Sequence, residues 1–354
     1  MRRLLGSCLA LILLLSTGYV KGQIANPQYI YTCNQGSASI SVIDNNTHEI
    51  AAVVDLQELG FSANAKPHHV IAEADGSHWY VTLIGENRVL KFDRDNKLIA
   101  ETEMEVPGLM TMDPQSDILY VGRSMSAVNP PQSFGVINRS DMSLESEKDL
   151  FFTRPHAITA LPGSDRIFVG SLSSNQFLST SSKEDDSELT NLEGMMNHML
   201  VNFAISPDKK TMVGTGQMTG KLLIFDITNP VSPVLEEAIA VNAAPWHPVF
   251  SPDGRFVYFA NKGTNTVTVI DMKKRAIDAV IKGKGLSQPH GAALSADGKF
   301  LYVSNNNRNG GYLPDGITAE DALGTVVVIN TQSKEIIKVI EVGKNATGIG
   351  TNVQ

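Results

Sequence analysis

Histidine is the residue type with the clearest chemical potential in this chain. A neutral imidazole nitrogen is a common ligand for transition metals, and imidazoles gathered in one place repel one another once they are protonated. A metal ion is therefore a common reason to collect them. Of the eight histidines, two are adjacent and four more follow singly: His68, His69, His156, His198, His247 and His290. Whether these six share one site depends on the fold.

Little other chemistry is visible in the 354-residue sequence. It has no Gly-rich phosphate loop after a strand, no Cys-x-x-Cys, no Cys-x-x-Cys-His for covalent haem and no Gly-x-Ser-x-Gly nucleophile elbow. Lys and Arg number 29 against 37 Asp and Glu, a net charge of −8, so we expect no nucleic-acid partner. The hydrophobic content of 42% is enough for a large globular core.

Residues 1–22 have the pattern of a secretory signal peptide. Two arginines precede an apolar run from Leu4 to Leu15, and small and polar residues follow as far as Gly22. The run is too short to span a bilayer comfortably, and no later segment is apolar enough, so we expect no membrane insertion. We predict cleavage after Gly22 and a periplasmic or secreted mature protein of residues 23–354.

The rest of the chain is built from an internal repeat. The segment Phe250–Asn261, FSPDGRFVYFAN, recurs as Leu294–Asn305, LSADGKFLYVSN, and looser copies occur elsewhere. Each copy predicts a strand, a tight turn on Asp-Gly or a polar equivalent, and a second strand rich in β-branched and aromatic residues. A third strand is predicted after each copy, at Arg88–Asp93, Ser133–Asn138, Gln176–Ser181, Lys221–Asp226, Thr266–Asp271 and Thr325–Asn330. A fourth, more polar strand leads to the next copy.

These repeats predict an all-β fold, a seven-bladed β-propeller over residues 23–354. Most first strands start about 40 to 50 residues apart, which with four strands per unit is typical of propeller blades. The stretch Pro27–Asn34 resembles the second strand of a blade that lacks a first strand, and Thr347–Val353 supplies one. We therefore expect the N- and C-terminal strands to share one blade, which leaves no open edge.

The repeat motifs carry a resemblance to a known family. Phe256–Asn261 and Phe300–Asn305, each after Asp-Gly, resemble the motif of the bacterial YVTN-repeat β-propellers, and Thr264–Asp271 resembles the strand that follows in that family. The resemblance covers essentially all of residues 23–354 and implies a fold more strongly than a function. Similar propellers form the copper-cluster domain of nitrous oxide reductase and the haem-binding domain of dissimilatory nitrite reductase.

A propeller would bring the histidines to one end of its axis. The first strand of each blade is innermost and begins at the mouth of the central channel. Aligned copies put this start at His68, Gly108, His156, Val201, Trp246, His290 and Gly348. His69 and His247 follow such a start by one residue, and His198 precedes one by three. A proline before the start in five blades fixes the direction of the residue after it.

The resemblance to nitrous oxide reductase implies copper at this mouth. There, histidines at the propeller axis hold a polynuclear copper cluster, and the pair His68 and His69 resembles an adjacent pair among them. Further ligands would come from His156, His198, His247 and His290. Met196 or Met199 would add a thioether beside His198, which suits Cu(I). Two blades lack histidine and no C-terminal cupredoxin domain is evident, so we expect a smaller copper site and not complete nitrous oxide reductase activity.

Three functions are compatible with the sequence. The first is redox or metal-handling work by an exported propeller that binds copper through the six histidines. The second is a non-enzymatic scaffold that binds a protein, peptide, glycan or small ligand at the channel mouth. The third is a metal-dependent hydrolase or lyase, for which an acidic ligand such as Asp315, Glu320 or Asp321 would have to reach the mouth.

Overall fold

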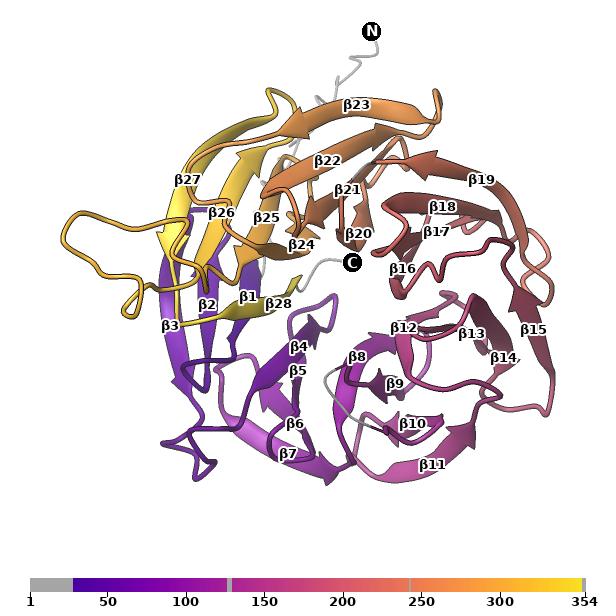
Figure 1. Ribbon diagram of the computed structural model, residues 1–354. Helices are drawn as coiled ribbons and strands as arrows, with labels where there is room; N and C mark the ends of the chain where they lie inside the picture. Colours follow the sequence, from indigo (N-terminus) through magenta and orange to yellow (C-terminus); the bar gives the residue numbers. More distant parts are fainter. Residues whose placement is uncertain (1–27, 126–128, 242, 352–354) are drawn as a thin grey trace, which may run out of the picture.

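A computed structural model describes residues 28–125, 129–241 and 243–351 of the chain. The predicted signal peptide, residues 1–22, lies outside these residues. The described part is all β: twenty-eight strands form seven four-stranded antiparallel sheets around one axis, as Figure 1 shows. The predicted seven-bladed propeller is confirmed. The described residues include no helix, and hence none long and apolar enough to cross a membrane.

Each blade contributes one strand to each of four positions between the axis and the rim. The innermost strands are β4 (Pro67–Ala72), β8 (Pro107–Met112), β12 (Pro155–Ala160), β16 (Leu200–Ile205), β20 (Pro245–Phe250), β24 (Pro289–Leu294) and β28 (Ala346–Thr351). The second strands are β1 (Tyr29–Asn34), β5 (His78–Leu83), β9 (Ile118–Arg123), β13 (Arg166–Ser171), β17 (Thr211–Gly216), β21 (Phe256–Asn261) and β25 (Phe300–Asn305).

The third strands confirm all six predicted ranges. They are β2 (Ser39–Asp44), β6 (Arg88–Asp93), β10 (Ser133–Asn138), β14 (Gln176–Ser181), β18 (Lys221–Asp226), β22 (Thr266–Asp271) and β26 (Thr325–Asn330). The rim strands are β3 (Glu49–Asp55), β7 (Leu98–Glu103), β11 (Leu144–Asp149), β15 (Ser187–Asn191), β19 (Val234–Ala240), β23 (Ala276–Ile281) and β27 (Glu335–Glu341).

Burial explains the composition of these strands. The third strands pack between neighbouring blades on both faces, so β26, with the sequence TVVVIN, is buried along almost its whole length. The rim strands face solvent, and β11, with the sequence LESEKD, is exposed at most positions. A continuous β-branched run therefore marks an inner strand of this fold, and a charged run marks the rim.

The ends of the chain close the ring by sharing one blade. β28 pairs antiparallel with β1, with Ile30 opposite Thr351 and Tyr31 opposite Gly350. Figure 1 shows the yellow β28 beside the indigo β1. The sheet order β28-β1-β2-β3 confirms the predicted closure. Because β28 pairs in this way, the first and last segments of the described chain leave no inner strand unpaired.

The asparagine that ends a repeat motif fastens the second strand to the third at the mouth. Asn34 Nδ2 donates to the Oγ atoms of Ser39 and Ser41 at 3.1 and 3.0 Å. Asn261 Nδ2 donates to the Oγ1 atoms of Thr266 and Thr268 at 2.9 and 2.7 Å. Both asparagines are fully buried. These paired bonds explain why the motif ends in Asn and the following strand starts with hydroxyl residues.

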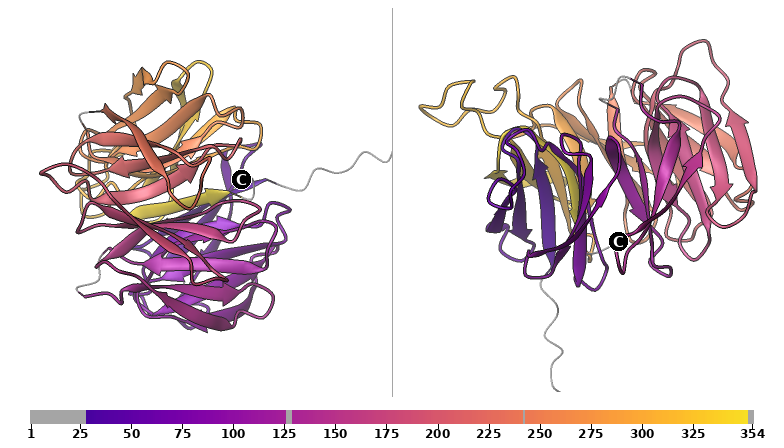
Figure 2. Two further views of the ribbon diagram at one scale, coloured as in Figure 1. Left: turned by 90° about the vertical axis from the view of Figure 1, so that its right-hand side faces the viewer. Right: turned by 90° about the horizontal axis from the view of Figure 1, so that it is seen from below.

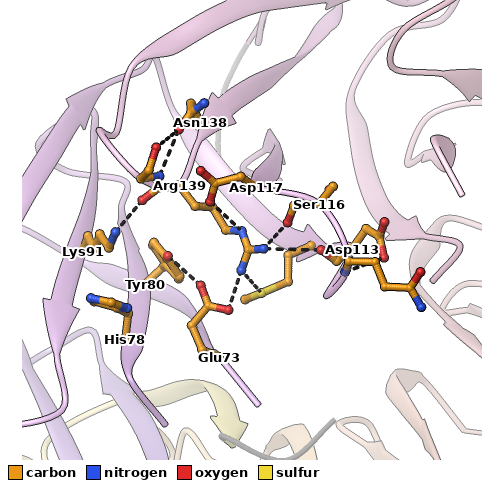
Figure 3. Close-up of polar contacts among 12 residues, drawn as sticks. Glu73, His78, Tyr80, Lys91, Asp113, Ser116, Asp117, Asn138 and Arg139 are labelled. Carbon is orange, nitrogen blue, oxygen red and sulfur yellow. Dashed lines mark hydrogen bonds and ion pairs between the residues drawn. The ribbon is translucent and has the colours of Figure 1, made fainter. Parts of the chain in front are cut away.

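A buried polar network joins the β4–β7 blade to the β8–β11 blade on the face opposite the mouth (Figure 3). Arg139 forms an ion pair with Glu73 and donates to the carbonyl oxygen of Ser116. Lys91 donates in turn to the carbonyl oxygen of Arg139. The Tyr80 hydroxyl donates to Glu73 Oε1 at 2.8 Å. Arg139 is 6% exposed, so its charge is compensated almost entirely by these protein partners.

Replacing Arg139 should therefore destabilise the propeller strongly. In Arg139→Met the Glu73 carboxylate loses its cationic partner in a largely buried position, which costs about 3 kcal/mol of unfolding free energy. The control Arg275→Met removes an exposed arginine paired with Glu236 and Glu237 and should change stability by less than about 1 kcal/mol. Urea unfolding followed by circular dichroism measures both. Equal effects of the two substitutions would contradict the role given to the network.

Candidate functional site

Each innermost strand carries a β-bulge directly after its first residue, at the mouth of the channel. In β4 the pairing with β5 shifts between Pro67 and Val70, so that His68 and His69 lie opposite a single residue. A bulge bends its strand and takes the side chains out of the regular alternation. Pro67 fixes its own φ and stiffens the entry. Two consecutive side chains can therefore reach the same region near the axis.

The other mouth histidines occupy equivalent bulge positions. His290 takes the first position in β24, as His68 does in β4, and His156 lies in the bulge of β12. His247 takes the second position in β20, directly after Trp246. The β-bulge that recurs in these strands, and not only the repeated sequence, therefore determines where the histidine side chains leave the backbone.

Three blades contribute no histidine to the mouth, and in one of them the bulge of β16 holds Val201 and Asn202. β8 has Gly108 at its first bulge position. In β28 the pairing shifts after Ala346, which puts Thr347 at the first position and Gly348 at the second. The predicted start of this strand at Gly348 is therefore wrong by one residue. Gly348 lies in the second bulge position, whereas Gly108, with which it was aligned, lies in the first. A Cβ atom on Gly348 would lie 2.2 Å from the carbonyl oxygen of His68, so glycine allows the two inner strands to approach.

The structure brings five imidazole rings together at the mouth. The ring centre of His68 lies 6.4 Å from that of His156 and 6.3 Å from that of His290. The ring centre of His247 lies 5.2 Å from that of His290 and 6.0 Å from that of His69. All five side chains are buried, with 1 to 8% exposure. We call these residues, which come from four blades, the five-histidine group.

His198 does not join the five-histidine group. Its Nδ1 lies 2.8 Å from Thr219 Oγ1, and its backbone N–H donates to Asn175 Oδ1 at 2.7 Å. Within the described ranges it makes no ring contact with another histidine. Met196, predicted to assist it, is 58% exposed, and Met199 is half-buried. Hydrogen bonds to the β17–β18 and β13–β14 turns therefore hold His198 in place.

Hydrogen bonds fix the tautomers of two members of the group. His156 Nδ1 lies 2.8 Å from the carbonyl oxygen of Val201, so it carries a proton and Nε2 keeps its lone pair. His69 Nδ1 accepts from the backbone N–H of Met110 at 3.1 Å, so the neutral ring carries its proton on Nε2. His68 Nδ1 lies 3.0 Å from Gln35 Nε2. The group therefore contains at least one lone pair that is oriented from behind by the protein.

Several buried polar atoms of the site form no hydrogen bond within residues 28–125, 129–241 and 243–351. They are His68 Nε2, His156 Nε2, His247 Nε2, His290 Nδ1 and the indole Nε1 of Trp246. A buried polar atom without a hydrogen bond costs about 1 to 3 kcal/mol, and native structures contain few of them. The five atoms lie in one small region and comprise four imidazole nitrogens and one indole N–H donor.

Burial keeps the imidazoles neutral. It lowers the pKa of His69 to about 3 and that of His156 to about 4. It also lowers the pKa values of His68, His247 and His290 well below the usual range, and the neighbouring imidazoles add to the effect. Neutral imidazole is the form that coordinates metals.

Two residues to which the sequence assigned no role also border the group. Trp246 is buried, and its ring centre lies 4.2 Å from that of His290. Lys262, just after β21, holds its Nζ 4.4 Å from the centre of the Trp246 ring. Lys262 directly follows the asparagine of a repeat motif, at the mouth. The place of Lys262 directly after a repeat motif was the one feature of the sequence that could have identified this residue.

The group is not a preformed metal site. In residues 28–125, 129–241 and 243–351, no set of three or more His, Cys, Asp and Glu side chains is arranged to hold a metal ion. The imidazoles would have to turn about their side-chain bonds to share one ion. Acidic ligands do not reach them: Asp315, Glu320 and Asp321 are exposed on the β25–β26 loop, which projects outward from the disc in Figures 1 and 2.

Comparison with known proteins agrees with this fold. Residues 170–332 match the family model for lactonases described as a 7-bladed beta-propeller. A curated relative, antigen Lp49 of Leptospira interrogans, is 32% identical over 96 residues, which are 26% of this chain and 20% of the relative. The match therefore spans about a fifth of the length of that relative, and its activity does not transfer to this chain.

Solved structures with the same architecture are distant in sequence. A functionally unknown protein from Desulfotomaculum acetoxidans has a TM-score of 0.72 at 16% identity, over 91% of this chain and 98% of its own. A candidate 6-phosphogluconolactonase from Bacteroides uniformis has a TM-score of 0.67 at 15% identity, over 92% and 99%. Dihydro-haem d1 dehydrogenase NirN, in complex with DHE, has a TM-score of 0.60 at 14% identity, over 91% and 74%. This chain is a seven-bladed β-propeller with the fold that the lactonase-type and NirN-type propellers share.

Proposed function

We propose that this chain is an exported β-propeller that binds a transition metal, copper first, through the five-histidine group. The observation that carries the proposal is a set of buried imidazole nitrogens that have no hydrogen-bond partner in the described part of the chain: His68 Nε2, His156 Nε2, His247 Nε2 and His290 Nδ1. Coordination by a metal ion would satisfy them. Export depends on the predicted signal peptide, residues 1–22.

The spacing of the rings suits a shared ion. Two imidazoles bound to one ion at metal–nitrogen distances of about 2 Å have ring centres about 5 to 6 Å apart. The four neighbouring pairs in the group have ring-centre distances between 5.2 and 6.4 Å. His156 is further oriented by its hydrogen bond to the carbonyl oxygen of Val201, the kind of support that metal-binding histidines usually have. Modest side-chain rotations would therefore be enough to form the site.

The donor set favours copper over harder metals. The group offers nitrogen atoms, and the carboxylates that the sequence suggested as ligands, Asp315, Glu320 and Asp321, are exposed on the β25–β26 loop. Magnesium, calcium and manganese prefer oxygen ligands, whereas copper and zinc accept imidazole, and copper binds nitrogen sites more tightly than zinc. The thioethers of Met196 and Met199 lie in the loop that holds His198, so a Cu(I)-specific sulfur ligand is not part of this proposal.

A lactone hydrolase is the second candidate. The match of residues 170–332 to the lactonase model favours it, as does the shared fold with a candidate 6-phosphogluconolactonase. The two candidates differ in a simple readout. A hydrolase should open sugar lactones at neutral pH, while a metal-handling propeller should bind copper and leave lactones intact.

Metal titration of the chain from residue 23, purified without a tag and stripped with a chelator, tests the main proposal. We expect retention of close to one copper ion per chain after gel filtration, measured by plasma mass spectrometry. His68→Ala combined with His290→Ala should weaken binding at least about 100-fold, because two of the proposed imidazole ligands are lost. Zinc is titrated in parallel and should bind more weakly.

The matched control for the metal titration is His48→Ala combined with His78→Ala. On the face opposite the mouth, His48 lies in the β2–β3 turn and His78 begins β5; His48 Nδ1 bonds the Tyr302 hydroxyl and His78 Nδ1 bonds Ser77 Oγ. Their loss should leave copper binding unchanged. Circular dichroism confirms that each variant is folded. Failure of the folded wild-type chain to retain copper or zinc, or equal losses in both double variants, would refute the proposal.

Acid should destabilise the metal-free protein through the same group. The folded-state pKa values of His69, about 3, and His156, about 4, lie below the usual value of 6.5, so the unfolded chain binds more protons. Stability is therefore full above about pH 6.5 and falls as the pH drops, by about 1.4 kcal/mol per pH unit for each group. Urea unfolding between pH 7 and 4.5, at intervals of about half a unit, measures this slope. It should be shallower in His69→Gln, and an unchanged slope would contradict the assignment.

A further inference from the structure

Three imidazoles of the five-histidine group are held at Nδ1, and two of them are held by the backbone. His156 Nδ1 donates to the carbonyl oxygen of Val201 at 2.8 Å, and His69 Nδ1 accepts from the backbone N–H of Met110 at 3.1 Å. A backbone carbonyl can only accept and a backbone N–H can only donate, so both tautomers are fixed. His156 therefore keeps a lone pair on Nε2, whereas His69 presents an N–H there.

The third ring, His68, is held by a side chain, the amide of Gln35. Gln35 Nε2 lies 3.0 Å from His68 Nδ1. An amide nitrogen can donate but not accept, so His68 Nδ1 accepts and the neutral ring carries its proton on Nε2. This Nε2 is buried and forms no hydrogen bond within the described ranges. In this state His68 offers the five-histidine group an N–H and not the lone pair that a metal ion requires.

Contacts at the junction of the two chain ends set the direction of the Gln35 amide. Gln35 lies in the turn after β1, and Asn345 directly precedes β28. Asn345 Nδ2 donates to Gln35 Oε1 at 3.3 Å, and the backbone N–H of Gln35 donates to the carbonyl oxygen of Asn345 at 3.1 Å. The first bond occupies the amide oxygen, so that the amide nitrogen faces His68. Two side-chain amides thus connect the last strand of the chain to an imidazole of the group.

The partner of His68 can be reversed, unlike the backbone partners of the other two rings. Rotation of the Gln35 amide about its last bond exchanges Oε1 and Nε2 with little change in shape. Oε1 would then accept from a proton on His68 Nδ1, and His68 Nε2 would carry the lone pair that coordination needs. The ring keeps one proton, which moves from Nε2 to Nδ1. The reversed amide loses its bond to Asn345, because two donor nitrogens would then face each other.

We propose that Gln35 is a positioning residue that switches His68 between an N–H donor and a metal ligand. The inference rests on the proposed metal site and adds how that site is controlled. His156 is ready to coordinate, whereas His68 becomes ready only when the Gln35 amide reverses. Because the reversal breaks the side-chain bond to Asn345, metal binding is coupled to the junction of the first and last strands. A chain in which this direction is already reversed should bind the ion more tightly.

Two substitutions of nearly unchanged shape reverse the direction of these hydrogen bonds. In Gln35→Glu, a carboxylate oxygen replaces Nε2 and accepts from His68 Nδ1, while the bond from Asn345 is kept. In Asn345→Asp, the side chain can no longer donate to Gln35 Oε1 and instead accepts from a reversed amide. Aspartate also tolerates the left-handed backbone of this position, where φ is 55°. Both variants should carry the His68 proton on Nδ1.

Two measurements test the proposal. Nitrogen NMR of the metal-free protein, labelled with ¹⁵N-histidine, reports which nitrogen of each neutral ring carries the proton, and His68→Gln identifies the His68 signals. We expect Nε2–H in the wild-type chain and Nδ1–H in Gln35→Glu and Asn345→Asp. Competition with a chelator of known affinity then measures copper binding. It should be about tenfold tighter in both variants, the effect usual for a partner that orients a metal-binding histidine.

The control for the added negative charge is Gln288→Glu. Gln288 is half-buried at the mouth, two residues before His290, and its Oε1 accepts from the backbone N–H of Arg308 at 2.9 Å. The substitution should change neither the His68 tautomer nor the copper affinity. An Nδ1–H signal for His68 in the wild-type chain overturns the proposal, as does copper binding by the wild-type chain that is no tighter in the two variants than in the control.

Failure of the proposed metal site gives a different result. In that case no chain binds copper, although the tautomers of His68 are those expected. Gln35 would then fix the His68 tautomer without any role in metal binding, and both the proposed function and the switch would be refuted. Circular dichroism confirms that each variant is folded.

Discussion

The pairing of β28 with β1 is the contact on which the rest of this molecule depends. Each blade buries its inner strands only against the neighbouring blades. The ring is therefore stable when every blade has a neighbour on both sides. Residues near position 30 and near position 350 must therefore meet before the inner strands of this blade are fully buried. β28 also lies against β4, where Gly348 approaches the carbonyl oxygen of His68, the first histidine of the mouth.

Ring closure brings the β-bulges of several blades together and so forms the five-histidine group. A single β-bulge presents one or two side chains at the end of one strand. Around a closed ring, the bulges of four blades present His68, His69, His156, His247 and His290 to one another. The imidazoles are then desolvated together, which keeps them neutral and leaves several of their nitrogens without partners. The backbone of the site is thus symmetric and its side chains are not, since the first bulge position holds Gly108 in β8, Val201 in β16 and Thr347 in β28.

The two faces of the propeller handle charge differently. On the face opposite the mouth, Arg139 is matched by Glu73 and by backbone carbonyls, and the charges serve to join two blades. At the mouth, the half-buried Lys262 holds its Nζ over the Trp246 ring and forms no ion pair with any residue that the structure describes. The first arrangement stabilises the fold by joining two blades.

Local pattern determined the strands, the blade count and the closure of this protein, because a tight turn on Asp-Gly and a run of β-branched residues are set by neighbours in the sequence. The six third strands, from Arg88–Asp93 to Thr325–Asn330, follow from that alone. The tertiary structure decided which histidines meet. His198 has the same residue type and nearly the same position in its repeat as the others, yet the loop hydrogen bonds to Thr219 and Asn175 hold it apart. The contact between Lys262 and Trp246 joins the residue after β21 to β20 of the same blade. The sequence repeat does not indicate this contact, so only the packing could reveal it.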